Sequence, residues 1–118
     1  MIDLLYYAMA GAFFTHELDA VKRHEWRVLP LIRALPDRIG EQLFIWGHVP
    51  LFALLMWGGD GTATSATRIG LSGFAILHLG LHILFHRHPR YEFNTASSWG
   101  LIILTALLGA AYLLVVMD

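Results

Sequence analysis

The chain has 118 residues, of which 57% are hydrophobic and only 14% charged, and its net charge is −1. One domain is expected at this length, and the apolar share exceeds that of an ordinary soluble domain. The small net charge argues against nucleic acid as a partner. The absence of cysteine excludes disulfides, iron–sulfur clusters and cysteine nucleophiles. Any metal would therefore be bound by histidine, carboxylate or main-chain oxygen.

Four apolar stretches follow one another along the chain, at about residues 2–21, 42–57, 69–86 and 98–117. Each is close to the roughly 17–25 residues that a helix needs to cross a bilayer. The first stretch lacks the basic start of a signal peptide and carries Asp3 instead. The sequence therefore predicts an all-α fold: an integral-membrane four-helix bundle, in the lipid bilayer, that forms a single four-span domain over residues 1–118.

Basic residues are distributed unevenly between the predicted loops. Seven Lys or Arg side chains lie in the loops that follow the first and third spans, whereas Arg68 alone lies on the other side. Cytoplasmic loops of membrane proteins carry an excess of Lys and Arg. We therefore expect a multi-pass protein of the plasma (inner) membrane, with both termini outside and both basic loops in the cytoplasm.

Residues 25–42 (EWRVLPLIRALPDRIGEQ), between the first two spans, mix arginines with apolar side chains. This composition favours a short amphipathic helix that lies in the membrane interface and is interrupted by Pro30 and Pro36. Two interpretations are open. The segment is a surface anchor, or it is a gate over a cavity on the cytoplasmic side.

Six ionisable side chains interrupt the spans on their cytoplasmic side, namely His16, Glu17, Asp19, His48, His78 and His82. A rise of about 1.5 Å per residue places them within about a helical turn of one layer. His78 and His82 are four residues apart and so project from one helix face, which is the spacing that helical zinc sites use. Pro50 is expected to kink the second span beside His48. Because ionisable residues inside membranes usually mark functional sites, we interpret the set as functional rather than as packing.

The fourth span carries almost no polar side chains. Thr105 and a few small residues, among them Gly100 and Gly109, stand out in an otherwise apolar run. We therefore expect this span to form a wall of the bundle, or a face through which two copies associate as a homo-oligomer.

Residues just beyond the first span have roles that the sequence leaves open. Glu25 would lie about 12 Å beyond Glu17 if the first helix simply continued, so it can join the site only if the chain turns back near Arg23 or His24. We assign Glu25, Arg23 and Arg27 to the residues around the site, which would contact the metal ligands and not the metal itself. Whether His24 takes part is left open, as it is for His86 and His88.

Two short motifs, HELDA at residues 16–20 and EWR at residues 25–27, carry a resemblance. They resemble the signature of a small family of uncharacterised bacterial four-helix integral-membrane proteins, a domain of unknown function. The resemblance covers nearly the whole chain and implies the four-helix topology and a polar constellation, without an activity. A looser similarity is to membrane proteins with an HxxEE motif. This chain has His16 and Asp19 at the first two conserved positions of that motif, but Ala20 in place of the second acid.

The function that the residues favour is that of a metal-dependent intramembrane hydrolase. His78 and His82 would bind a divalent ion, with zinc favoured and iron as the alternative. A third ligand, either His16 or His48, would leave one position open for water, which is the pattern of catalytic zinc sites.

Carboxylates beside the expected ion would take part in the reaction. Glu17 or Asp19 would accept the proton of the metal-bound water as general base. The substrate would be a lipid ester or amide, or another apolar molecule, taken from the cytoplasmic leaflet. A two-iron version needs more carboxylate ligands, which Glu25 and these two acids would supply.

Two other function classes remain open. A b-type haem protein would use His48 with His78 or His82 as two axial ligands, with room made by small neighbours such as Gly47 and Gly80. A non-catalytic membrane subunit would be a small transport or proton-relay subunit, in which Asp, Glu and His side chains pass protons, or a scaffold. Haem leaves the neighbouring acids unexplained, and a proton path would need titratable groups in the outer halves of the spans.

Overall fold

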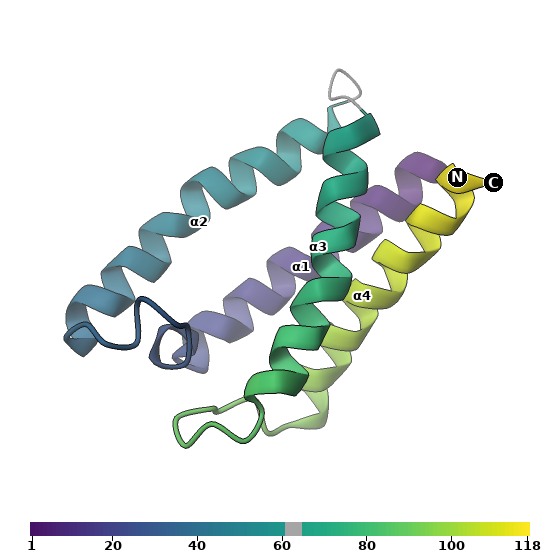
Figure 1. Cartoon of the computed structure of the whole chain (residues 1–118). Helices are drawn as coiled ribbons and strands as arrows, with labels where there is room; N and C mark the ends of the chain where they lie inside the picture. The colour runs from purple at the N-terminus through teal and green to yellow at the C-terminus, as the bar shows by residue number, and fades with distance from the viewer. Residues whose placement is uncertain (61–64) are drawn as a thin grey trace.

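The structure is a computed structural model that describes residues 1–60 and 65–118 (Figure 1). Its long helices are α1 (Ile2–Lys22), α2 (Asp37–Gly59), α3 (Ser65–Phe85) and α4 (Ala96–Met117), and a short 3-10 helix, η1 (Glu25–Arg27), follows α1. The described residues contain no strand. The predicted all-α, four-helix fold is therefore confirmed, although α2 begins at residue 37 rather than near residue 42.

Local chemistry explains where the helices begin and end. The Thr95 side chain accepts a hydrogen bond from the backbone N–H of Ser98 at 3.1 Å, which caps the start of α4. Pro36 precedes α2, and Asp37 places a negative charge at the positive end of that helix. After α1, His24 adopts a left-handed backbone with φ of 54°. This residue turns the chain so that η1 comes to lie against α1.

The helices α1, α3 and α4 pack closely, whereas α2 lies near α3 at its C-terminal end and diverges from it towards its N-terminal end (Figure 1). Buried apolar residues form one group towards the termini, Tyr6, Met9, Ala75 and Tyr112, and another towards the opposite loops, Ala20, Trp26, Phe44, Phe93 and Ile102. Gly109 permits the close approach of α4 to α3, because a Cβ there would lie 2.8 Å from the carbonyl oxygen of Ser72.

Arg68 ties the end of α2 to α3 and α1. Its Nε donates to the carbonyl oxygen of Gly58 at 2.6 Å, one Nη donates to that of Gly59 at 3.1 Å, and the other pairs with Asp3. The last carbonyls of a helix have no partner within the helix. The buried guanidinium satisfies them and holds this end of α2 in place.

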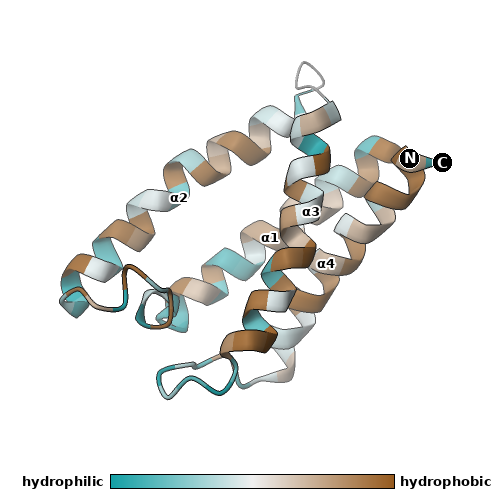
Figure 2. Cartoon of the chain, viewed as in Figure 1, coloured by the Kyte–Doolittle hydropathy of each residue, from teal (hydrophilic) through white to brown (hydrophobic). Residues whose placement is uncertain are grey.

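Three helices, α2, α3 and α4, are each long and apolar enough to cross a membrane. Figure 2 shows the brown, apolar stretches of these helices and the mostly teal, hydrophilic connection between α3 and α4. Large apolar side chains are exposed along them, among them Trp46, Leu77 and Leu107. Such an apolar surface suits a lipid environment better than water. Helix α1, whose second half carries several polar residues, is not among the three, and its crossing of a bilayer stays a prediction.

The short amphipathic segment expected between α1 and α2 is helical over fewer residues than predicted. Only Glu25–Arg27 is helical, residues 28–35 form turns and bends, and the residues from Asp37 onward already belong to α2. Pro30 lacks the N–H that a helix needs, and Leu31 has a positive φ of 25°. The turns place Val28 and its neighbours over a cavity beside the bundle.

Candidate metal centre

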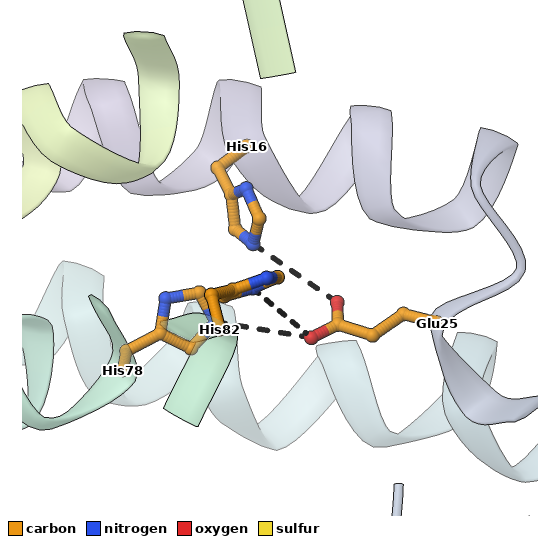
Figure 3. Close-up of side chains that lie close together, drawn as sticks. All are labelled: His16, Glu25, His78 and His82. Atoms are coloured by element: carbon orange, nitrogen blue, oxygen red, sulfur yellow. Dashed lines mark ion pairs between the residues drawn. The ribbon is translucent and has the colours of Figure 1, made fainter. Parts of the chain in front are cut away.

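Four side chains from three elements converge inside the bundle: His16 from α1, Glu25 from η1, and His78 and His82 from α3 (Figure 3). We refer to them as the His–Glu cluster. Each offers one ligand atom, and these atoms lie within 4.8 Å of one another. All four residues are buried. Bonds of about 2.1 Å to a tetrahedral ion would bring ligand atoms to roughly 3.4 Å apart, so modest side-chain rotations would close the cluster on one ion.

The helix geometry explains how the three imidazoles meet. His78 and His82 lie one turn apart on one face of α3, as their spacing predicts, with ring centroids 4.6 Å apart. The ring of His16 faces both of them, with centroid distances of 4.7 and 5.1 Å. Phe93 stacks on His16 with centroids 5.6 Å apart and meets His82 edge-on at 4.7 Å. The rings are thus held in an apolar setting.

Glu25 reaches the cluster because the chain turns back at His24. Without such a turn Glu25 would lie too far along the helix axis to join the site. Its Oε1 lies 3.5 Å from Nε2 of His82 and 3.9 Å from Nε2 of His78, whereas its Oε2 lies 4.0 Å from Nε2 of His16. Burial opposes ionisation of the Glu25 carboxyl, but the imidazoles, His82 foremost, lower its pKa below the usual value. The carboxylate is therefore available as a ligand at the centre of the cluster.

Several ring nitrogens of the cluster are buried without a hydrogen-bond partner in the described part of the chain. They are both nitrogens of His16, Nδ1 of His78 and Nε2 of His82. Buried polar atoms are nearly always hydrogen-bonded. Imidazole nitrogens that face one another and a carboxylate, and that have no protein partner, are the donors that a metal ion uses.

Tyr91 holds the ring of His82 from outside the cluster. Its Oη lies 2.8 Å from Nδ1 of His82, and this contact leaves Nε2 on the side of Glu25. Burial raises the pKa of Tyr91, so the hydroxyl stays protonated and neutral. An outer partner of this kind fixes the orientation of a metal-binding histidine. The sequence analysis did not assign Tyr91 to the site, and the available signal was a phenol close to the end of the helix that carries the histidine pair.

Glu17 and His48 form a pair beside the His–Glu cluster. Nε2 of His48 lies 2.6 Å from Oε2 of Glu17, and Nδ1 of His48 lies 2.7 Å from the carbonyl oxygen of Phe44. Because a carbonyl oxygen only accepts, Nδ1 of His48 carries a hydrogen. The other oxygen of Glu17, Oε1, lies 3.9 Å from Nε2 of His16. His48, one of the expected ligands, thus faces Glu17, and Glu17 links it to the cluster.

The remaining expected site residues near α1 make other contacts. Asp19 accepts a hydrogen bond from Oγ of Ser98 at 2.6 Å and pairs with Arg23 at 3.2 Å, so it ties α1 to the start of α4. Arg27 donates twice to the carboxylate of Asp37, at 2.8 and 2.9 Å. These contacts join helix ends and loops and do not reach the cluster.

The histidines whose part was left open contact the loops. Nδ1 of His24 lies 2.7 Å from Glu92, and Nδ1 of His86 lies 2.6 Å from the carbonyl oxygen of Ile83. Nδ1 of His88 accepts the backbone N–H of Arg90 at 3.2 Å. None of the three is part of the group of ligand atoms found among the described residues.

A cavity of about 500 Å³ extends from the cluster between α2 and α3. Its polar lining comes from Glu17, Glu25, His48, His78, His82 and Tyr91, and most of its other lining residues are apolar, among them Leu43, Leu51, Phe74, Leu81 and Phe85. The volume is that of a typical small-molecule site. Val28, Pro30 and Ile32, from the segment interpreted as an anchor or a gate, also line it. The cavity can therefore bring an apolar molecule to the cluster.

Comparison with known proteins identifies a family without an assigned activity. No curated protein and no solved structure matches the chain. A model described as a family of unknown function (DUF6713) matches residues 2–118, a span that contains the whole His–Glu cluster. This match confirms the resemblance to an uncharacterised four-helix family. The chain belongs to this family of unknown function, DUF6713.

Proposed function

We propose that the protein binds a divalent metal ion in the His–Glu cluster and uses it to hydrolyse a lipid or another apolar substrate at the membrane. The observation that carries the proposal is the convergence of four buried ligand groups at one end of an apolar cavity. A bundle of this size needs no such set for packing, because hydrogen bonds between membrane helices contribute only about 1 kcal/mol each.

The donor set agrees best with zinc, with iron as the alternative. Three imidazoles and one carboxylate, without thiolate, are ligands that both metals accept. Four protein ligands complete a tetrahedral shell, so a reactive water needs either a fifth position or a ligand that yields its place. Glu25 is the ligand best able to yield, because it comes from a short 3-10 helix and not from a long one.

Glu17 is the residue to which we assign the role of base. Its Oε1 lies 3.9 Å from Nε2 of His16, beside the proposed ion, whereas Asp19 is engaged by Ser98 and Arg23. A bound divalent ion lowers the pKa of its water towards neutrality. Glu17 accepts the proton, the water oxygen adds to the substrate carbonyl, and the acyl–oxygen or acyl–nitrogen bond breaks. The proton then passes to the leaving group, which gives a free acid and an alcohol or amine.

The substrate would reach the metal from the cytoplasmic leaflet. The loops that carry most of the basic residues lie at one end of the bundle and the two termini at the other, which agrees with the proposed orientation (Figure 1). Placed in this way, the His–Glu cluster lies in the cytoplasmic half. Lining residues such as Leu43 and Phe74 are exposed, so the cavity is accessible from the side of the bundle.

The geometry favours a bare ion over haem. The three clustered rings have centroids 4.6 to 5.1 Å apart, and a carboxylate lies among them, which leaves little space for a macrocycle between two of these rings. The axial pair considered above would also require His48 to leave Glu17.

Metal analysis of detergent-purified protein, with a visible spectrum, tests the proposal. We expect at least one zinc or iron ion per chain, lost in a His78→Ala/His82→Ala variant and retained in a matched His86→Ala/His88→Ala variant. Hydrolysis of acyl esters of increasing chain length should require the metal, and Glu17→Gln should abolish it while at least one ion remains.

Three results would count against the proposal. No metal in folded protein would refute the centre. A metal without hydrolysis of any ester or amide tested would refute the enzyme and favour a non-catalytic subunit. A Soret band would favour the haem protein.

A further inference from the structure

We infer that the His–Glu cluster is one half of a two-metal centre, in which Glu25 bridges two divalent ions and Glu17 and His48 complete the second position. The inference rests on the proposed metal site and extends it by a second ion. It follows from which histidine each oxygen of the Glu25 and Glu17 carboxylates faces.

The first step is the orientation of Glu25. Its Oε1 faces the pair on α3, at 3.5 Å from His82 and 3.9 Å from His78, whereas Oε2 faces His16 on α1, at 4.0 Å. A carboxylate whose two oxygens face different histidines is arranged to bridge two ions. Two-metal sites hold their ions about 3.5–4 Å apart. His78, His82 and Oε1 of Glu25 then form the first position.

The second step is the chain of donors that continues beyond His16. Nε2 of His16 lies 3.9 Å from Oε1 of Glu17, and Oε2 of Glu17 lies 2.6 Å from Nε2 of His48. The second position thus has His16, His48, Glu17 and Oε2 of Glu25. Each position receives two imidazoles and at least one carboxylate oxygen, a donor set typical of zinc, iron and manganese.

A third, independent observation concerns the outer nitrogens of His48 and His82. Metal-binding histidines almost always donate their other ring N–H to a carbonyl, carboxylate or similar group. Nδ1 of His48 lies 2.7 Å from the carbonyl oxygen of Phe44, and Nδ1 of His82 lies 2.8 Å from Oη of Tyr91. In both cases Nε2 is left on the inner side, where it faces Glu17 or Glu25. Both rings are thus oriented in the same way, one for each position.

A second ion would take the place of the direct contact between Glu17 and His48. Both side chains line the cavity, as Glu25, His78 and His82 do, so both positions would border it. With both positions filled Glu17 is a ligand, and the role of base assigned to it above applies to the one-ion state. A water held between the two ions would then be the nucleophile for a substrate in the cavity.

Metal stoichiometry tests the inference without reference to any activity. Purified protein is stripped with a chelator, equilibrated with Zn²⁺, freed of unbound ion, and analysed for zinc per chain. We expect about two ions in the unaltered chain and about one in Glu17→Gln and in His48→Ala. The ion that remains in these variants shows that the His–Glu cluster is still folded. Glu41→Gln and His86→Ala are matched controls, expected to keep both ions.

Electron paramagnetic resonance of the Mn²⁺-loaded protein adds a measure of separation. Two Mn²⁺ ions held by one carboxylate should give a spin-coupled spectrum, and His48→Ala should convert it to that of an isolated ion. One ion in the unaltered chain, unchanged by either variant, overturns the second position and leaves the single-ion site intact. No ion at all refutes both proposals. Two ions retained in both variants, or both ions lost in either, overturns a second position built on Glu17 and His48.

Discussion

Tyr91 allows a direct test of how the ring of His82 is held. Its hydroxyl lies 2.8 Å from Nδ1 of His82, while Nε2 of the same ring faces Glu25 at 3.5 Å. Tyr91→Phe removes this hydroxyl and keeps the ring, which packs against Phe93 with centroids 5.2 Å apart. A buried donor that loses its partner costs about 1–3 kcal/mol. Loss of the outer partner of a metal-binding histidine lowers affinity by about 10- to 100-fold, which is the same range of free energy.

The assay is a Zn²⁺ titration in competition with a chromogenic chelator, in detergent, on the unaltered chain and on two tyrosine variants. Tyr91→Phe should weaken zinc binding by about 10- to 100-fold. Tyr7→Phe is the matched control, because its hydroxyl donates to the carbonyl oxygen of Gly59 at the end of the bundle where the termini lie. Its zinc affinity should not change. An affinity of Tyr91→Phe within about twofold of the unaltered chain would refute the idea that Tyr91 orients His82. An equal loss in both variants would indicate a general effect on the fold.

Two further predictions concern stability in detergent, measured by thermal unfolding with circular dichroism. Gly109→Ala should destabilise by about 1–3 kcal/mol, since its Cβ would lie 2.8 Å from the carbonyl oxygen of Ser72. Gly100→Ala, whose Cβ would meet no described atom within 4 Å, should stabilise α4 by up to about 1 kcal/mol, and a loss equal to that of Gly109→Ala would contradict this reasoning. Arg68→Met should cost about 2–3 kcal/mol, because the buried guanidinium satisfies helix-end carbonyls. Asp3→Asn should matter much less, because Asp3 is largely exposed; similar losses in both would refute that role for Arg68.

The sequence predicted the elements and the histidine pair because both depend on short-range pattern. Long apolar stretches indicated the helices, and a spacing of four placed His78 and His82 on one face of α3. The depth argument also brought His16 and Glu17 to the same region, since depth depends only on the rise per residue. Such features are properties of one helix at a time.

The membership of the cluster depended on features that no single helix contains. Glu25 joins it because one residue, His24, has a left-handed backbone, a conformation that few residues other than glycine adopt and that the pattern did not indicate. Asp19, by contrast, lies towards Ser98 on α4, and only the packing of α1 against α4 decides this. The choice between two neighbouring acids, Glu17 and Asp19, therefore needed the tertiary structure.

Polar contacts at both ends of α2 explain how so small a protein keeps a cavity open between its helices. At one end, Tyr6 donates to the carbonyl oxygen of Leu55 at 2.7 Å, and Arg68 satisfies the last carbonyls of the helix. At the other end, Nε1 of Trp26 donates to Asp37 at 2.9 Å. A helix held mainly by apolar packing along its length would close on α3 and fill the space beside the cluster. Near its middle, His48 holds α2 to Glu17 of α1. Because these polar contacts fasten α2 near its ends and to α1, the helix can stay apart from α3, and the cavity between them leads to the His–Glu cluster.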